Sequence, residues 1–438
     1  MTSVLHPPLP APETFTLQGG CPVWVLRRPG PAIVSAKLWI RGGSSADPRG
    51  QRGRAQLLAG LLSRGCGDLS GEAMADLVEG LGDELRCEAS EDGLLISLKC
   101  ASADSTALLP LLHAMVLNPW LASDQISLER QLNLQALLRQ REDPFQQAHD
   151  LLRHQLYGDG PYGHDPLGVE AELTGLERPL LLEAAGQLGA AGAVLVITGQ
   201  PPPQLPALLE PPAGPVWPTA APLAAAGPAG RSIAALVTTE LDTEQLVLML
   251  GAATVSLADP RSVALRLLQC HLGVGMSSRL FVALREEQGL AYDVGVHLPA
   301  RRGAAPFVLH LSSSADRASE ATTQLLQEWQ RLLDQPLTND EWQLALAKFR
   351  GLVATGRQTC GQIADRQALV LGHGLAWTYS DQASQAAEAL DPEALWQAAR
   401  SLLARPSLSL CGPAAALVAA ERAWSAHPLG SSASALLS

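Results

Sequence analysis

Aromatic side chains are scarce in this chain, because Phe, Trp and Tyr together make up only 4% of its 438 residues. Hydrophobic residues nevertheless reach 47%, so Leu and Ala must supply most of the packing. Long apolar runs are also missing, since the longest nearly apolar stretch, residues 246–257, is too short to cross a bilayer. These features predict a globular protein with large buried cores and no membrane partner.

Paired cysteines and an excess of positive charge are absent as well. The seven cysteines are scattered singly with no C-x-x-C spacing, which favours reduced thiols over a disulfide framework. The net charge of −12 disfavours nucleic acid and anionic membranes as partners, because both bind basic surfaces. Residues 1–14 lack the basic and apolar regions of a secretory signal, so we expect a cytoplasmic location.

The chain repeats its order of elements. The tetrapeptide Ala-Asp-Pro-Arg occurs at residues 46–49 and again at 258–261, each time before a predicted helix. Residues 201–230 hold ten prolines, which predict a stiff linker. We therefore expect an α+β protein with two homologous domains, each a mostly antiparallel sheet covered by helices. The expected domains are residues 1–200 and 231–438.

Hydrophobic periodicity, turn residues and helix caps locate the expected elements. Strands are expected at residues 23–26, 33–40, 84–89, 94–100, 193–198, 233–237, 245–250 and 307–311. Helices are expected at residues 55–62, 71–82, 105–117, 125–141, 144–156, 180–188 and 315–333.

Residues 273–294 are the most informative stretch. Gly273 and Gly275 predict a loop whose backbone is free to approach a ligand. The hydroxyl of Ser277 or Ser278 can then cap a helix that ends near the next glycine, before a strand begins. The stretch is thus predicted to form a loop, a helix and a strand.

Arg285 and Tyr292 lie seven residues apart in this stretch, late on the helix and early in the strand. The intervening turn can bring the guanidinium and the phenol to one side, where they could grip a peptide carbonyl or an oxyanion. For an isolated pair, a surface ion pair and a core tyrosine would be the simpler interpretation.

The whole run, G-x-G-M-S-S-R-L-F-x-x-L-R-E-E-x-G-L-A-Y, closely resembles the C-terminal half-motif of the insulinase-like metallopeptidases. This is the family of pitrilysin and the mitochondrial processing peptidase. The resemblance implies the insulinase-like metallopeptidase fold. It also implies that Arg285 and Tyr292 contact substrate, opposite a zinc site carried elsewhere.

The zinc site itself is degenerate. In the family, an inverted motif H-x-x-E-H on the helix after residues 42–53 supplies two His ligands and a catalytic Glu. Matched by position, these residues are Gln56, Ala59 and Gly60 here. The distal Glu ligand, in a pattern E-R-x-x-V-x-x-E, is Ala136. Ala and Gly cannot bind a metal, and Gln56 alone is a poor zinc ligand.

No other residues offer a substitute metal site. His149 and His154 are five apart on a predicted helix and so point to different faces, while His164 lies in a predicted loop. Cys66 has no evident His partner and is expected to be structural.

The resemblance and the missing ligands together imply a non-catalytic, substrate-binding subunit. It would bind no cofactor of its own and would pair with a zinc-bearing homologous subunit around a peptide substrate. Two alternatives stay open: a structural scaffold subunit, and a self-paired peptide-binding protein that forms a homodimer when alone.

Overall fold

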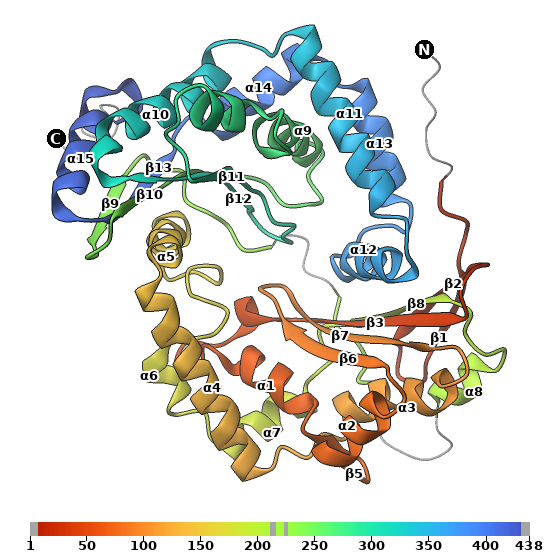
Figure 1. The fold of residues 1–438 in the computed structure, drawn as a ribbon. Coiled ribbons are helices and arrows are strands. Elements are labelled where there is room, and N and C mark those ends of the chain that lie inside the picture. Colours follow the sequence, from red (N-terminus) through yellow and green to blue (C-terminus); the bar gives the residue numbers. More distant parts are fainter. Residues whose placement is uncertain (1–7, 211–215, 223–226, 431–438) are drawn as a thin grey trace. The chain divides into compact units, whose positions relative to one another are not determined.

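The computed structural model describes residues 8–210, 216–222 and 227–430, whose contacts form two compact units (Figure 1). Unit 1 comprises the described residues of Met1–Leu137, Asp165–Ala225 and Ala354–Asp381. Unit 2 comprises those of Leu138–His164, Ala226–Val353 and Gln382–Ser438. Each unit takes one segment from the other half of the chain. The compact units therefore differ by these two segments from the contiguous ranges 1–200 and 231–438.

Unit 1 is built on a six-stranded sheet with the order β1-β2-β8-β3-β7-β6. Its strands are β1 (Glu13–Thr16), β2 (Pro22–Arg27), β3 (Ile33–Arg41), β6 (Glu84–Ala89), β7 (Gly93–Ala101) and β8 (Ala193–Gly199). All neighbours pair antiparallel except β2 and β8. The uniformly apolar β8 is central and buried, whereas β6 alternates between exposed and half-buried residues and forms an edge.

Unit 2 repeats this arrangement with the order β11-β12-β10-β13-β9. Its strands are β9 (Leu236–Glu240), β10 (Gln245–Ala253), β11 (Asp293–His297), β12 (Pro306–Ser314) and β13 (Ser407–Gly412). Only β13 and β9 pair parallel. The order and the single parallel pair match the strands β6-β7-β3-β8-β2 of unit 1. This confirms the predicted α+β fold of two homologous, mostly antiparallel sheets.

Helices cover both faces of the first sheet (Figure 1). Those of unit 1 are η1 (Ser44–Ala46), α1 (Arg54–Leu62), α2 (Gly71–Glu79), α3 (Ser105–Leu117), α6 (Glu170–Leu173), α7 (Arg178–Gly186), α8 (Leu205–Leu209) and α12 (Cys360–Gly372). A short hairpin joins β4 (Gly65–Cys66) to β5 (Leu69–Ser70). The main core lies between the sheet, α1 and α3, while a smaller cluster around Trp39 and Ile363 packs α12 on the opposite face.

The helices of unit 2 are α5 (Pro144–Tyr157), α9 (Ser262–Gly273), η2 (Phe281–Glu286), η3 (Ala315–Arg317), α10 (Ala318–Asp334), α14 (Pro392–Leu402) and α15 (Ala414–Ala426). Three more, α4 (Ser123–Glu142), α11 (Asn339–Thr355) and α13 (Tyr379–Ala389), run from one unit into the other. The helix α5 packs on the sheet of unit 2 through Leu152 and Leu156, beside Met249 and Cys411.

One helix in each unit comes from the other half of the chain: α12 in unit 1 and α5 in unit 2. Equivalent hydrogen bonds hold these two exchanged helices on their sheets. In unit 1 the hydroxyl of Thr198 on β8 donates to the carbonyl of Cys360 on α12 over 2.7 Å. In unit 2 the hydroxyl of Ser409 on β13 donates to the carbonyl of Ala148 on α5 over 2.8 Å. Because all four residues are buried, each bond satisfies groups that water cannot reach.

Most predicted elements are present, with three informative differences. The strand β8 lies between β2 and β3, an insertion that the order of the two predicted N-terminal strands along the chain did not indicate. The strand β9 begins at Leu236 rather than at residue 233, because its ladder with β13 begins there. Most elements after α11, including β13, gave no clear sequence signal. Within the predicted linker, residues 211–215 and 223–226 lie outside the described residues, as do residues 1–7 at the N-terminus.

Candidate functional site

Three of the positions matched to the zinc motif lie on α1. Ala59 is buried, whereas Gln56 and Gly60 are partly exposed. A Cβ atom at Gly60 would lie only 2.4 Å from Oε2 of Glu129 on α4. The structure thus brings Gly60 against α4, but two helical turns before Ala136, which is itself partly exposed.

The carboxylate of Glu129 fills the space beside Gly60. Glu129 is 8% exposed, and its Oε1 accepts a hydrogen bond of 2.8 Å from Nε of Arg64. Nη2 of Arg64 donates to the same oxygen. One turn further along α4, Asn133 is 6% exposed, and its Nδ2 has no hydrogen-bond partner within the described residues. The ion pair of Glu129 with Arg64 therefore lies beside the position where the family has its second histidine.

These residues do not fit a zinc ion. Ala59 and Gly60 carry no donor atom, and the nearest carboxylate, that of Glu129, is neutralised by Arg64. Among the described residues, no group of three or more His, Cys, Asp or Glu is placed to hold a metal. Burial also raises the pKa of the Cys66 thiol to about 11, which opposes formation of a nucleophilic thiolate.

The two motif glycines have different roles. Gly273 is the last residue of α9, and a Cβ there would lie 2.8 Å from Cγ2 of Val296 on β11. It therefore permits close packing of helix on strand, rather than the free loop predicted from sequence. Gly275 has φ +77°, and a Cβ added there would meet nothing within 4 Å, so it does form an open left-handed turn.

The helical segment that follows is wider than an α-helix. The carbonyl of Ser278 accepts from the amide of Val282, but the next bonds include a π-type one from Glu287 N to Val282 O over 3.0 Å. Ser278 is buried and Ser277 exposed, and η2 has no side-chain cap. The predicted serine cap is therefore absent from η2.

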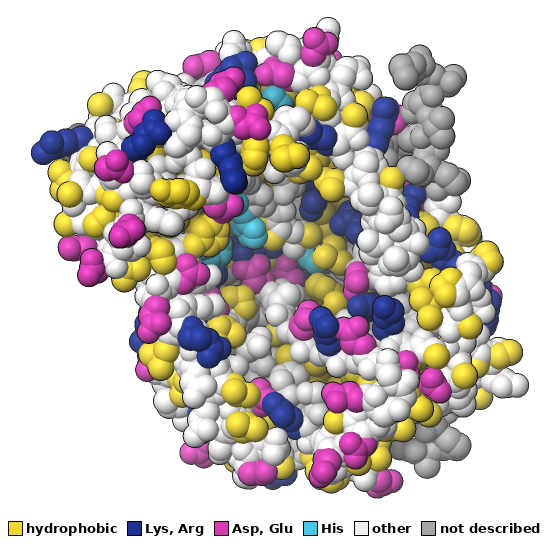
Figure 2. Space-filling view, in the orientation of Figure 1, with side chains coloured by type: hydrophobic (Ala, Val, Ile, Leu, Met, Phe, Trp, Pro, Cys, Tyr) yellow, Lys and Arg dark blue, Asp and Glu magenta, His cyan; other side chains and the backbone are white. Residues whose placement is uncertain are grey.

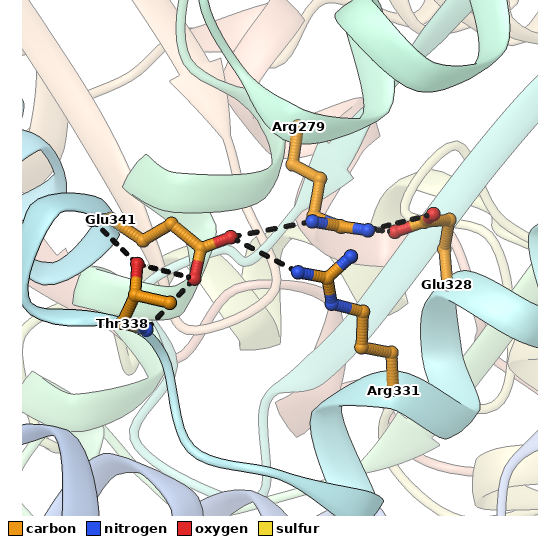
Figure 3. Close-up of polar contacts among 5 residues, drawn as sticks. All are labelled: Arg279, Glu328, Arg331, Thr338 and Glu341. Carbon is orange, nitrogen blue, oxygen red and sulfur yellow. Dashed lines mark hydrogen bonds and ion pairs between the residues drawn. The ribbon is translucent and has the colours of Figure 1, made fainter.

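Arg279 secures the base of η2 through an ion-pair network (Figure 3). Its guanidinium bonds both carboxylate oxygens of Glu328 on α10, and Nη1 lies 3.3 Å from Oε1 of Glu341 on α11. Arg331 approaches the same oxygen at 3.4 Å, while Oε2 of Glu341 accepts from the amide of Thr338 at the start of α11. This motif arginine thus joins three helices.

The structure brings Arg285 and Tyr292 together. Nη1 of Arg285 donates to the main-chain carbonyl of Tyr292 over 3.1 Å, and its guanidinium lies 5.1 Å from the ring centre of Phe281. The amide of Tyr292 donates to the carbonyl of Ser312 on β12, which fixes the start of the edge strand β11. The phenol itself remains 61% exposed.

The two residues do not fit the simpler interpretation of a surface ion pair and a core tyrosine. Among the described residues, Arg285 has no carboxylate within ion-pair distance, and Tyr292 is not in the core. The pair is a forked cation and a phenol, both directed to solvent at the edge of a sheet. This arrangement can donate hydrogen bonds to a carbonyl or an oxyanion that reaches it.

Histidines on the opposite face of the same strands were not recognised in the sequence. His310 on β12 lies 3.4 Å from Asp293, the residue after Tyr292, and meets the ring of Phe145 on α5 edge-on. His149 on α5 meets His297 in the same way, with ring centres 5.6 Å apart. The alternation of side chains along β12 predicts the face of the sheet on which His310 lies. His149 reaches that face only because α5, from the first half of the chain, packs on the sheet of unit 2.

Burial lowers the pKa of these imidazoles. That of His149 falls to about 3 and that of His297 to about 4, with the neighbouring cations Arg153 and Arg301 acting in the same direction. The pKa of His310 is also lowered by burial, although Asp293 opposes the shift. The three rings are therefore neutral at physiological pH.

Comparison with known proteins agrees with the motif. Residues 23–168 match the family described as insulinase, peptidase family M16, and residues 190–349 match the description peptidase M16 inactive domain. A protein of Streptomyces coelicolor described as an uncharacterized zinc protease is 24% identical over 417 residues, covering 91% of this chain and 89% of that protein.

Two solved structures share the fold. The peptidase M16 inactive domain from Pseudomonas fluorescens has a TM-score of 0.82 at 22% identity, covering 92% of this chain and 98% of that one. A protease from Helicobacter pylori has a TM-score of 0.81 at 17% identity, covering 92% and 100%. Fold and motif thus define a peptidase-like protein with two homologous units. The chain belongs to the insulinase-like peptidase family and lacks that family's zinc motif.

On the face drawn in Figure 2, acidic and basic side chains are interspersed rather than gathered into a basic area. Within the described residues, no helix is both long enough and apolar enough to cross a bilayer.

Proposed function

We propose that this chain is the non-catalytic, substrate-binding subunit of a heterodimeric zinc peptidase. A homologous subunit would carry the zinc, and this chain would supply Arg285 and Tyr292 to a peptide enclosed between the two. The observation that carries the proposal is the exposure of both side chains at neighbouring positions, where the guanidinium of Arg285 donates to the main-chain carbonyl of Tyr292 over 3.1 Å and the phenol is left open to solvent.

The chemistry of the pair suits this role. A guanidinium keeps its charge at all relevant pH values and can hold a peptide carbonyl by two parallel hydrogen bonds. A phenol adds a neutral donor whose position is set by the ladder between Tyr292 and Ser312. The network at Arg279 holds the start of η2 against α10 and α11 (Figure 3). Arg285 belongs to the same helical segment, which this network fixes in place. Donors placed in advance at developing charge stabilise a transition state effectively.

The degenerate motif in unit 1 supports the assignment of catalysis to a partner. Gln56, Ala59, Gly60 and Ala136 offer no set of ligands, so the isolated chain should bind no stoichiometric zinc and cleave no peptide. Metal analysis of the purified chain and a peptide digestion assay test this. One tightly bound zinc per chain, together with chelator-sensitive cleavage, would contradict the proposal.

The role of the pair is tested by reconstitution with the zinc-bearing partner. Arg285→Ala and Tyr292→Phe should each lower kcat about a hundredfold to a thousandfold, the usual cost of removing one transition-state donor. A role in holding the ground state would raise KM instead. The matched control is Arg405→Ala, which removes an exposed arginine of unit 2 that has no partner within the described residues. Size-exclusion chromatography checks that all complexes assemble equally.

Other outcomes identify the remaining alternatives. If both variants support full activity, the pair has no catalytic role and the scaffold function is favoured. If no zinc-bearing partner associates and the chain forms a homodimer that binds peptide, it is a self-paired peptide-binding protein.

A further inference from the structure

A cavity of about 500 Å³ lies within unit 1, beside the start of α12 and over the face of β3, β7 and β6 that this helix leaves open. We call it the α12 groove. Its lining includes side chains from both the helix and the strands: Ser35, Lys37, Glu84, Arg86, Glu88, Leu95, Ser97, Leu98, Lys99, Thr359, Gly361, Gln362 and Asp365. None of these residues belongs to the degenerate zinc motif or to the Arg285 and Tyr292 pair.

One hydroxyl in the lining has no use within the fold. Ser35 is 0% exposed, and its Oγ has no hydrogen-bond partner among the described residues. A buried hydroxyl without a partner is destabilising, so it requires an explanation. The next hydroxyl in the same row of the sheet, that of Thr198, is fully used by the carbonyl of Cys360.

The start of α12 supplies two further donors at the same place. Thr359 and Gln362 form a capping box that uses the amide of Gln362, but the amides of Cys360 and Gly361 have no acceptor within the described residues. A Cβ at Gly361 would lie 4.0 Å from Oγ of Ser35 and 3.8 Å from Oγ1 of Thr359, with nothing nearer. The Cβ position of Gly361 is therefore open, at ordinary contact distance from the hydroxyl of Ser35.

The charge around the groove favours an anion with a single negative charge. Lys99 lies opposite Ser35 in the β3–β7 ladder, is exposed and has no carboxylate partner within the described residues. The other two cations are paired, Lys37 with Asp365 at 2.7 Å and Arg86 with Glu84 at 2.5 Å. Together with Glu88 the lining holds three cations and three anions, so only the helix terminus and Lys99 remain to balance a ligand. A dianion such as phosphate would be poorly compensated.

We propose that the α12 groove binds a carboxylate group. Its oxygens would accept from the amides of Cys360 and Gly361 and from the hydroxyl of Ser35, with Lys99 as the nearby cation. Such a group is present at the C-terminus of a peptide and in small carboxylic acids. The site is independent of the function proposed above, because it uses none of the same residues.

The probes are acetate, a short polyalanine peptide with a free C-terminal carboxylate, the same peptide as its C-terminal amide, and inorganic phosphate. Binding to the full chain is followed through the amide NMR resonances of Cys360 and Gln362. A saturable shift with the free-carboxylate peptide but not with its amide supports the proposal and assigns the ligand as a peptide terminus. A shift with acetate alone supports a small carboxylic acid. Tighter binding of phosphate, or no shift with either carboxylate, overturns the proposal.

Two variants make the test specific. Gly361→Ala places a methyl group in the ligand's space at ordinary contact distances, so it should abolish the saturable shift while the protein stays folded. Ser35→Ala removes one hydrogen bond to a charged group and should raise Kd about tenfold. The matched controls are Gly351→Ala, a helical glycine with nothing within 4 Å, and Ser313→Ala, another fully buried hydroxyl without a partner in the described residues. Unchanged binding in Gly361→Ala, or equal losses in the controls, would overturn the assignment.

Discussion

The two units share one sheet and differ in what that sheet presents. In unit 1 a row across the strands reads Glu84, Lys99, Ser35 and Thr198; the corresponding row of unit 2 reads Gly295, His310, Met249 and Ser409. The last member of each row anchors the exchanged helix through its hydroxyl. Both sheets thus keep the hydroxyl that bonds the exchanged helix, whereas the other three residues of the row differ between the two units.

The changed positions decide which ligands each unit can accept. Met249 fills, with an apolar side chain, the place of the unpartnered hydroxyl of Ser35, so unit 2 has no counterpart of the α12 groove donors. In unit 2 the glycine opposite His310 leaves room for the imidazole, because a Cβ at Gly295 would lie 2.9 Å from that ring. The comparison teaches that the fold is held by a few buried bonds and that function depends on residues beside them.

The repeated Asp-Pro turns should respond to pH in opposite directions. Asp47 accepts from the amides of Gly53 and Ala55 at 2.9 and 3.1 Å, yet burial raises its pKa to about 6 from the ordinary 3.8. The stability that a raised carboxyl pKa contributes is fully present below about pH 4 and is lost as pH rises through 6. Between pH 7 and pH 4 the wild type should therefore gain about 2–3 kcal/mol relative to Asp47→Asn. Urea denaturation at several pH values measures this.

Asp259, the counterpart in unit 2, is the matched control. Hydrogen bonds from Arg261 lower the pKa of Asp259. The stability that this carboxylate contributes to the folded protein is therefore lost as pH falls below the usual pKa range of a carboxyl group. The relative stability of Asp259→Asn should change in the opposite direction and by much less, because the pair is exposed to solvent. Equal responses of the two variants would show that the turns are electrostatically equivalent.

The two helix anchors should be similar in strength. Thr198→Val and Ser409→Ala each remove one buried hydrogen bond to a helix carbonyl, which should lower the free energy of unfolding by about 1–1.5 kcal/mol. Stability is measured by urea denaturation, with Ser313→Ala as a control that removes an unpartnered hydroxyl. A loss confined to one variant would mean that only one exchanged helix depends on its anchor.

The smallest effect is expected at the degenerate zinc motif. An alanine at an open helical glycine such as Gly351 should stabilise the protein by about 0.5–1 kcal/mol. Gly60→Ala should lack this gain and be less stable than Gly351→Ala by about 1 kcal/mol, because its methyl group must displace the carboxylate of Glu129 from Arg64. Equal stability of the two variants would show that Glu129 moves aside without cost.

Much of the fold was predictable because its signals are local. The span of α3 follows from an apolar repeat that Pro119 interrupts, and β6 follows from strict alternation. The closeness of Arg285 and Tyr292 along the fold was also expected, since only one turn separates them. Their contact through a main-chain carbonyl, and the π-type widening of η2, did not follow, because periodicity does not report hydrogen-bond register.

By itself the sequence determined the family, the duplicated α+β fold and the absence of zinc ligands at Gln56, Ala59, Gly60 and Ala136, because identity at a matched position needs no geometry. Only the tertiary structure decided which sheet each of α5 and α12 covers, that Glu129 occupies the space beside Gly60, and that the hydroxyl of Ser35 lies near the start of α12. These features join residues tens to hundreds of positions apart, and the energy of a long-range contact depends on packing that no local pattern encodes.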